Sequence, residues 1–362
     1  MSASLEGIFS QEPIAGVFES IKPGFPTALP AGFYTVSKSE PAANGLFTYD
    51  KVEGTRKTAR AVRYNAKSSV RNVSGVDTVP VKAMFSAEHL DFDLARLINI
   101  RQLGGNNVEA IAMSEINRRL GEARQLQQNL RNAAVHLSLM DGILYFDIDG
   151  NVLPTSASST YSIDWSVPAS NKDQMTDVAG SPIIGTTWAT NSTDIAGDVN
   201  NIKTTALKRT GYPLKYAVYG SNILEYIQSN TNLANQINGD AIMAHGLNES
   251  GELPSPFLGL TWIRGDQFFW EDNDGTTRSN VGADQVLYYP EPDPSWYDFV
   301  ETPYLFTEQE GLVDISAVSS RFGPSIQTKV TSDPVAASGI YRDAFLPVIN
   351  VPSAIYLSDV TP

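Results

Sequence analysis

The residues best suited to chemistry are acids, and two short runs place them beside a glycine. Asp147-Ile148-Asp149-Gly150 and Asp272-Asn273-Asp274-Gly275 superficially resemble calcium loops. In an EF-hand loop, however, the glycine stands at the sixth position and a glutamate at the twelfth. Neither run meets these requirements, so both are predicted to be hairpin turns.

Histidine and cysteine add little chemistry. His89, His136 and His245 stand far apart, and the absence of cysteine excludes disulfides, thiolate catalysis and thiolate metal sites. The motifs GxSxG, GxxxxGK(S/T), GxGxxG and HExxH are also absent. A carboxylate pair for glycoside hydrolysis stays open, because 40 acids offer many candidates. We expect no enzyme, no cofactor and no metal.

Charge is unevenly distributed along the chain, whose 362 residues carry a formal net charge of −14. Residues 51–71 hold seven basic residues against one acid, so this stretch has a charge of +6 and the remainder has −20. The cations are Lys51, Arg56, Lys57, Arg60, Arg63, Lys67 and Arg71. A solvated charge run and contact with nucleic acid are both open. We favour complementary surfaces on identical neighbours, since like-charged subunits otherwise repel.

The net negative charge of the whole chain argues against a surface that binds nucleic acid or anionic lipid, because phosphate binding relies on Lys and Arg. No run of 18 or more apolar residues exists, and the first residues lack a basic start and an apolar signal core. We therefore expect no membrane association and synthesis in the cytoplasm.

The element that must position these residues is a long helix predicted over residues 106–141. Apolar residues recur every three or four positions from Val108 to Met140. Asn106 with Glu109 fits a capping box, and Gly142 suits the left-handed conformation that ends a helix. The helix would be about 50 Å long. It is either a long core helix or the spine of a flat subunit built to tile. The opposite, polar face holds Glu115, Arg118, Arg119, Glu122, Arg124, Gln127, Gln128 and Arg131.

Shorter elements are predicted on both sides of this helix, giving an α+β fold. Residues 1–32 read as an extended arm with one helical turn, and residues 33–85 as a long β-hairpin with a turn at Asn44-Gly45. Residues 86–103 are predicted to form a short connecting helix. Further predictions are a hairpin over 143–154, a helix over 194–210 ended by Gly211, and strands over the last fifty residues.

Three stretches carry a resemblance to a known family. They are the helix of Asn117–Leu144, which runs into a glycine, the strand pair with an exposed turn in Trp262–Pro290, and the last strand with proline in Tyr341–Val360. With the order of the elements, they resemble the major capsid protein of tailed bacteriophages, in particular the lambda-like major head protein family with the Hong Kong 97 type fold. The resemblance spans nearly the whole chain in its layout.

The resemblance implies a division of the chain and a function. Residues 1–32 would be an N-terminal arm, 33–85 an extended β-loop lying over a neighbour, 86–185 with 313–362 a peripheral domain containing the spine helix, and 186–312 an axial domain. The protein would assemble in the host cytoplasm into hexamers and pentamers, which form the icosahedral virion capsid around double-stranded DNA.

The resemblance also implies partners. These would be further copies of the chain, a portal protein, a separate scaffolding protein, a possible decoration protein and DNA without sequence-specific contacts. The seven cations would face acids of the adjacent subunit, and no isopeptide crosslink is expected. The acids singled out are Glu109, Glu115, Glu122, Glu291, Asp293, Glu308 and Glu310.

Two alternatives stay open. An encapsulin-type shell protein would have the same fold. The Trp, Asn and Thr content of residues 154–193 and 260–300 would also suit a glycan-binding or tail structural module.

Overall fold

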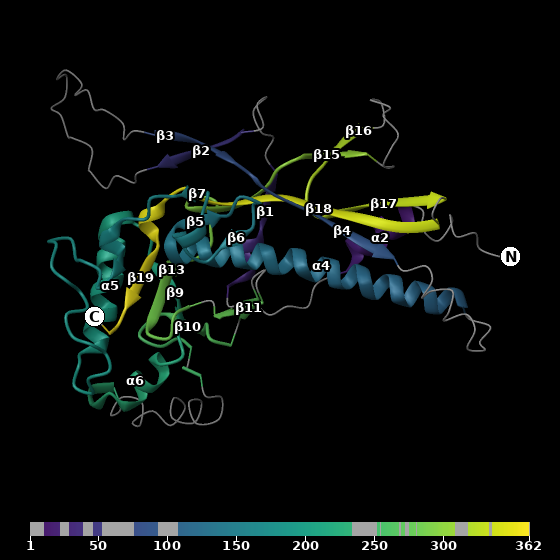
Figure 1. Ribbon diagram of the computed structural model, residues 1–362. Helices are drawn as coiled ribbons and strands as arrows, with labels where there is room; N and C mark the ends of the chain where they lie inside the picture. Colours follow the sequence, from purple (N-terminus) through teal and green to yellow (C-terminus); the bar gives the residue numbers. More distant parts are fainter. Residues whose placement is uncertain are drawn as a thin grey trace, which may run out of the picture.

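The computed structural model describes residues 11–21, 29–38, 46–52, 76–92, 108–233, 252–253, 255–267, 269–271, 275–279, 281–307, 318–332 and 335–361. In the elongated body, a long helix lies against one sheet, and a second sheet with two helices forms one end (Figure 1). A two-stranded ribbon leaves the body at upper left in that view. The element order confirms the predicted α+β class.

The long helix is α4 (Val108–Asp141), which has 34 residues and a length of about 50 Å. It confirms the prediction over 106–141, although Asn106 lies outside the described residues. The helix ends where Gly142 adopts a φ of 65°. A side chain at that position would collide with Val167, so glycine is required for both conformation and space.

The first sheet is organised around one long strand. Its members are β1 (Val36–Lys38), β4 (Met84–Phe92), β14 (Tyr297–Glu301), β17 (Ser325–Ser332) and β18 (Val335–Ile349). Phe345 of β18 pairs with Glu301 on one side and with Met84 on the other. One edge of β18 is therefore shared by β17 and β14, and the opposite edge carries β4 over nine residue pairs.

Two predictions for this region are wrong. Residues 86–92 form part of strand β4, where a helix was predicted, because pairing with β18 overrides the local leucine spacing. Residues 93–103 lie outside the described parts of the chain. Residues 36–38 were assigned to the hairpin, but they pair in parallel with β14.

The predicted hairpin exists further along as β2 (Leu46–Val52) and β3 (Val76–Lys82), paired from Leu46↔Lys82 to Val52↔Val76. The chain between the two strands comprises residues 53–75, and the turn predicted at Asn44-Gly45 lies outside the described residues. A second ribbon pairs β15 (Tyr304–Thr307) with β16 (Val318–Arg321).

The second sheet has the order β10 (Thr261–Arg264), β9 (Leu214–Tyr219), β13 (Gln285–Pro290), β19 (Tyr356–Asp359) and β8 (Lys172–Asp173). It packs with α5 (Ile195–Thr210) and α6 (Ile223–Ser229) around a separate core cluster. Asp194 caps α5 by accepting a hydrogen bond from the Gly197 backbone N–H, and Gly211 ends it with a φ of 86°. The helix predicted over 194–210 is therefore confirmed.

The two sheets exchange strands across the predicted domain limits. Strand β14 comes from the 186–312 segment but belongs to the first sheet, while the C-terminal β19 belongs to the second. Sheet membership thus does not coincide with those limits, and the division itself stays a prediction.

Short elements complete the fold. The hairpin predicted over 143–154 is confirmed as β5 (Ile143–Phe146) and β6 (Val152–Leu153), and β7 (Tyr161–Asp164) pairs with the other edge of β5. A second hairpin joins β11 (Phe269–Glu271) to β12 (Thr277–Ser279). The predicted turn near the N-terminus is the ten-residue helix α2 (Gln11–Ser20), which packs on α4 and β17. The 3-10 helices are η1 (Ala31–Tyr34), η3 (Ser156–Ser158), η4 (Ala169–Asn171) and η6 (Pro352–Ala354).

Candidate assembly surface

Most of the predicted inter-subunit residues cannot be placed. Six of the seven cations fall in residues 53–75, and Glu308 with Glu310 falls in residues 308–317, outside the described chain. Lys51 lies on β2 and Glu109 on α4, but the structure describes neither side chain. The cations concerned are Arg56, Arg60, Arg63 and Arg71 with Lys57 and Lys67.

The four predicted acids that can be placed each have a partner within the chain. Glu115 and Glu122 both accept hydrogen bonds from Arg118, on the exposed side of α4. Glu291 lies 2.7 Å from the Lys215 ammonium. The carboxylate of Asp293 accepts a hydrogen bond from the Ser295 backbone N–H at 2.8 Å. Hydrogen bonds from the side chain and the backbone of Ser295 lower the pKa of Asp293. Their role between subunits stays a prediction.

The predicted polar face of α4 is partly wrong. Gln127 is 1% exposed and Arg131 is 7% exposed, whereas Leu126, assigned to the apolar stripe, is 53% exposed. His136 lies on the buried side of the same helix and is 1% exposed. The buried face of this helix therefore mixes apolar residues with polar ones, including a charge.

The buried charge is satisfied by two acids from the first sheet. The Arg131 guanidinium donates to Asp343 of β18 through Nε at 2.6 Å and to Glu301 of β14 through Nη2 at 2.7 Å. Its Cζ atom lies 5.3 Å from the ring centres of both Phe299 and Phe345. Burial acts to lower the pKa of Arg131, but the hydrogen bonds and charges of the two acids outweigh it and raise that pKa. This network ties the spine helix to two strands.

A second arginine lies where the N-terminal helix meets the spine. The guanidinium of Arg124 lies 5.7 Å from the ring centre of Phe18, which is fully buried on α2. Burial, and secondarily the charge of Arg131, lowers the pKa of Arg124. On the outer side of α2, Glu19 lies 3.3 Å from Arg321 of β16. Helix α2 is thus held by both apolar and charged contacts.

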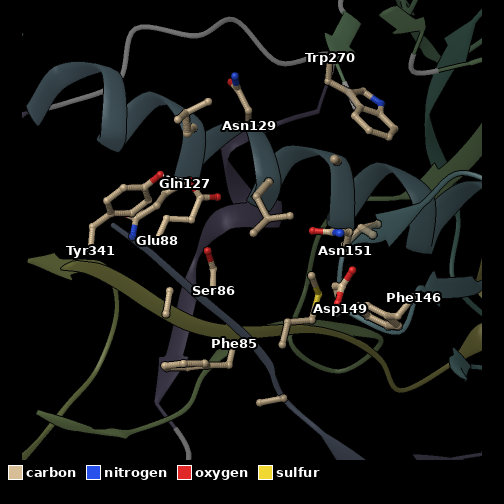
Figure 2. A pocket seen from close by; sticks show the side chains of 18 of the residues that line it. Phe85, Ser86, Glu88, Gln127, Asn129, Phe146, Asp149, Asn151, Trp270 and Tyr341 are labelled. Carbon is tan, nitrogen blue, oxygen red and sulfur yellow. Dashed lines mark hydrogen bonds between the residues drawn. The ribbon is translucent and has the colours of Figure 1, made fainter. Parts of the chain in front are cut away.

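A groove with a volume of about 780 Å³ runs between α4, β4 and the turn of the β5–β6 hairpin. Figure 2 shows Ser86, Glu88 and Gln127 between the helix and the strands, and Asp149 with Asn151 at the other end. We call this feature the β4–α4 groove. The described residues include eight exposed large hydrophobic side chains, and four of them line it, namely Phe85, Leu126, Ile148 and Tyr161.

The charges around the β4–α4 groove have one sign. Glu88, Asp149 and Glu271 line it, and no lysine or arginine of the described residues does. The sequence did not reveal these three acids as a set. Glu88 fell in a predicted helix, Glu271 in the strand pair predicted within Trp262–Pro290, and Asp149 was predicted only as a turn residue. The three acids lie close together because β4, β11 and the β5–β6 turn meet beside α4. No local sequence pattern indicates that these three segments meet.

The described residues contain no group of three or more histidine or acidic side chains that could hold a metal ion. None of their helices is long and apolar enough to cross a membrane.

Comparison with known proteins gives a family and a fold. The sequence profile of phage major capsid protein E matches residues 15–299 of the chain. No curated protein sequence matches. A putative capsid protein of a prophage of E. coli CFT073 is similar in structure, with 16% identity and a TM-score of 0.52 over 78% of this chain and 79% of that chain.

Two further solved structures are similar to the chain over almost its whole length. A phage-related protein from Bordetella bronchiseptica RB50 has 11% identity and a TM-score of 0.49, with 96% of each chain covered. A structure from Gordonia phage Cozz has 10% identity and a TM-score of 0.46, with 94% of this chain and 89% of that chain covered.

Proposed function

The chain belongs to the family of phage major capsid protein E, and on that premise we propose how it builds a shell. It is a phage capsid protein with the Hong Kong 97 type fold, and its place is the virion capsid. We propose that copies assemble into hexamers and pentamers, which close an icosahedral shell around the double-stranded DNA of a tailed phage. It acts as a structural protein without catalytic activity.

The observation that carries this proposal is the combination of a rigid spine with a projecting ribbon. Hydrogen bonds from Arg131 to Asp343 and Glu301 fix the spine helix α4 to the first sheet, so the helix and the sheet form one rigid unit. The β2–β3 ribbon leaves the body (Figure 1) and leads to residues 53–75, which carry six of the seven cations. Tyr49 of β2 and Val81 of β3 are buried in the core and anchor the ribbon to the body. We propose that the ribbon carries residues 53–75 into contact with a neighbour.

The proposed division of labour follows the chain. Residues 1–32 form an arm, 33–85 a loop over the neighbour, 86–185 with 313–362 a peripheral domain, and 186–312 an axial domain around the symmetry axes. The acidic remainder of the chain, with a charge of −20, would not adhere to packaged DNA. A portal protein, a scaffolding protein and a possible decoration protein complete the proposed partners, and assembly takes place in the host cytoplasm.

The proposal is tested by the size of the expressed protein. We would examine the cleared lysate by sedimentation and electron microscopy, with and without the neighbouring genes of the operon. Closed hollow particles, or sheets and tubes of hexamers, are expected. A discrete species near the monomer mass under both conditions would refute shell formation. A cargo enzyme inside the particles would instead identify an encapsulin-type shell.

A further inference from the structure

We propose that the β4–α4 groove binds a linear aliphatic polyamine, a chain of methylene groups with positively charged nitrogens along it. The site lies within one copy of the chain, where β4, α4, the β5–β6 turn and β11 meet. It adds a small-molecule ligand to the proposed role in shell building and does not depend on assembly. The class of ligand follows from the charge of the groove, the spread of its acids, its apolar lining and one buried amide.

The charge of the groove selects a cation, and the spread of its acids selects an extended one. Glu88, Asp149 and Glu271 line the groove, and no lysine or arginine of the described residues does. These acids do not converge on one point, since the described residues contain no acidic group that could hold a metal ion. A divalent ion needs several oxygens at about 2.0 to 2.6 Å from its centre. Acids spread along a groove instead suit a cation whose charges are also spread.

Much of the remaining lining is apolar. Met84, Ala133, Phe146 and Ile163 line the groove as buried residues, and Leu126 lines it with about half of its surface exposed. Methylene groups that leave water for such a surface contribute favourably to binding, whereas a hydrated metal ion gains nothing from it. The combination of acids with an apolar lining therefore matches a ligand that alternates ammonium groups with hydrocarbon.

A buried amide without a partner lies in the same groove. The Gln127 side chain is 1% exposed, and neither its amide oxygen nor its amide nitrogen has a hydrogen-bond partner. Figure 2 shows it close to Glu88 and Tyr341, and the Tyr341 hydroxyl donates a hydrogen bond to the Glu88 carboxylate. Buried polar groups without partners are costly. A ligand ammonium that donates to the Gln127 oxygen and to Glu88 would remove this cost.

Strand β4 places two of the polar groups on the side of the helix. Alternate residues of a strand share one face, so Ser86 and Glu88 lie on the face of β4 that carries the buried Met84. The Ser86 hydroxyl can therefore accept from the same ammonium. The groove volume of about 780 Å³ falls within the roughly 300 to 1,000 Å³ of small-molecule sites. Since the chain carries a net charge of −14, a bound polyamine would also lessen repulsion between copies.

Isothermal titration calorimetry of the full-length protein with spermidine tests the site. The comparison cations are butylamine, which has a single ammonium, and Mg²⁺, which has both charges on one atom. We expect one spermidine per chain, with both comparison cations binding at least about tenfold more weakly, because neither can reach separated acids. Hydrogen exchange should show that spermidine protects residues 84–88 and 126–133, which locates the ligand between β4 and α4.

Variants at the groove test its chemistry. Asp149→Asn with Glu271→Gln removes two exposed charges and should weaken spermidine binding at least about tenfold. Gln127→Leu keeps a similar volume but removes the amide, and it should also weaken binding. The matched control, Asp91→Asn with Glu225→Gln, changes the net charge equally at two exposed acids outside the groove. It should bind spermidine as the unchanged protein does. Circular dichroism of each variant establishes that it is folded.

Several outcomes would overturn the site. Absence of spermidine binding would do so directly. Equal weakening by the control pair, or butylamine or Mg²⁺ binding as tightly as spermidine, would mean that the protein attracts cations only through its overall charge. Protection outside β4 and α4 would place the ligand elsewhere. None of these results bears on shell formation, which is judged from the size of the particles.

Discussion

Arg131 and Asp343 form a two-point contact in the interior of the protein, although 212 positions separate them in the sequence. Nε donates to Oδ2 at 2.6 Å and Nη2 donates to Oδ1 at 2.7 Å, and Asp343 is completely buried. This planar geometry is one that arginine can make and lysine cannot. Because α4 and β18 are the longest helix and strand described, the contact sets how the two lie against each other.

Removing this arginine should leave two buried acids uncompensated. We expect Arg131→Met to lower the free energy of unfolding by about 3 to 5 kcal/mol, the usual cost of breaking one side of a buried ion pair. Urea unfolding followed by tryptophan fluorescence measures it. The matched control is Arg118→Met on the exposed side of α4, which should shift the midpoint little. Equal shifts for both variants would contradict a structural role for the buried network.

Elements with local signals were predictable. The spine helix follows from apolar spacing and from Gly142, and α5 follows from Asp194 at its start and Gly211 at its end. The β5–β6 hairpin follows from Asp149-Gly150, where Asp147 accepts hydrogen bonds from the Asp149 and Asn151 backbone N–H groups. In each case the residues that determine the structure lie within a few positions of it.

Features set by distant segments were not predictable. Arg131 was assigned to solvent because nothing near it reveals that Glu301 and Asp343 would approach. Strand β4 was taken for a helix because its partner β18 lies some 250 positions away. For the same reason, the predicted acids were chosen one by one from the sequence. The acids that share a groove with exposed apolar residues emerged only from the tertiary structure.

Leucines along α4 should differ sharply in their contribution to stability. Leu139 is 0% exposed, so Leu139→Ala should cost about 2 to 5 kcal/mol through the cavity it creates. Leu130 is only partly buried, and Leu130→Ala should cost less. Leu126 is 53% exposed, and Leu126→Ala should stay within about 0.5 kcal/mol. Thermal and urea unfolding of the three variants would reveal this order, and a uniform cost would contradict the described orientation of the helix.

Arg209 should control the local stability of residues 172–183. Its guanidinium donates to the carbonyls of Thr176 and Asp177 at 2.9 and 2.8 Å, and to Asn171 Oδ1 at 2.8 Å. Arg209→Lys keeps the charge but cannot span these acceptors. We expect amide hydrogen exchange in 172–183 to become at least tenfold faster, with little change in the first sheet. Lys208→Ala on the exposed side of α5 is the control and should leave exchange unchanged.

The buried His136 should make the protein sensitive to mild acid. Burial lowers the pKa of this ring from 6.5 to about 3, so the folded protein holds it neutral over a range in which the unfolded chain binds a proton. Stability from this group is therefore complete above about pH 6.5 and is lost as the pH falls toward 3. At one pKa unit per about 1.4 kcal/mol, the loss at pH 5 is about 2 kcal/mol.

His136→Leu removes this proton uptake and should flatten the pH dependence between pH 6.5 and 4. The measurement is the difference in the free energy of unfolding between the variant and the unchanged protein, taken by urea titration at half-unit pH steps. The other titratable groups contribute equally to the pH dependence of both proteins, so their contributions cancel in the difference. Leu139→Ala, which changes a buried residue of the same helix that does not titrate, should run parallel to the unchanged protein. A difference for His136→Leu that stays constant with pH would mean that the ring becomes solvated in the folded protein.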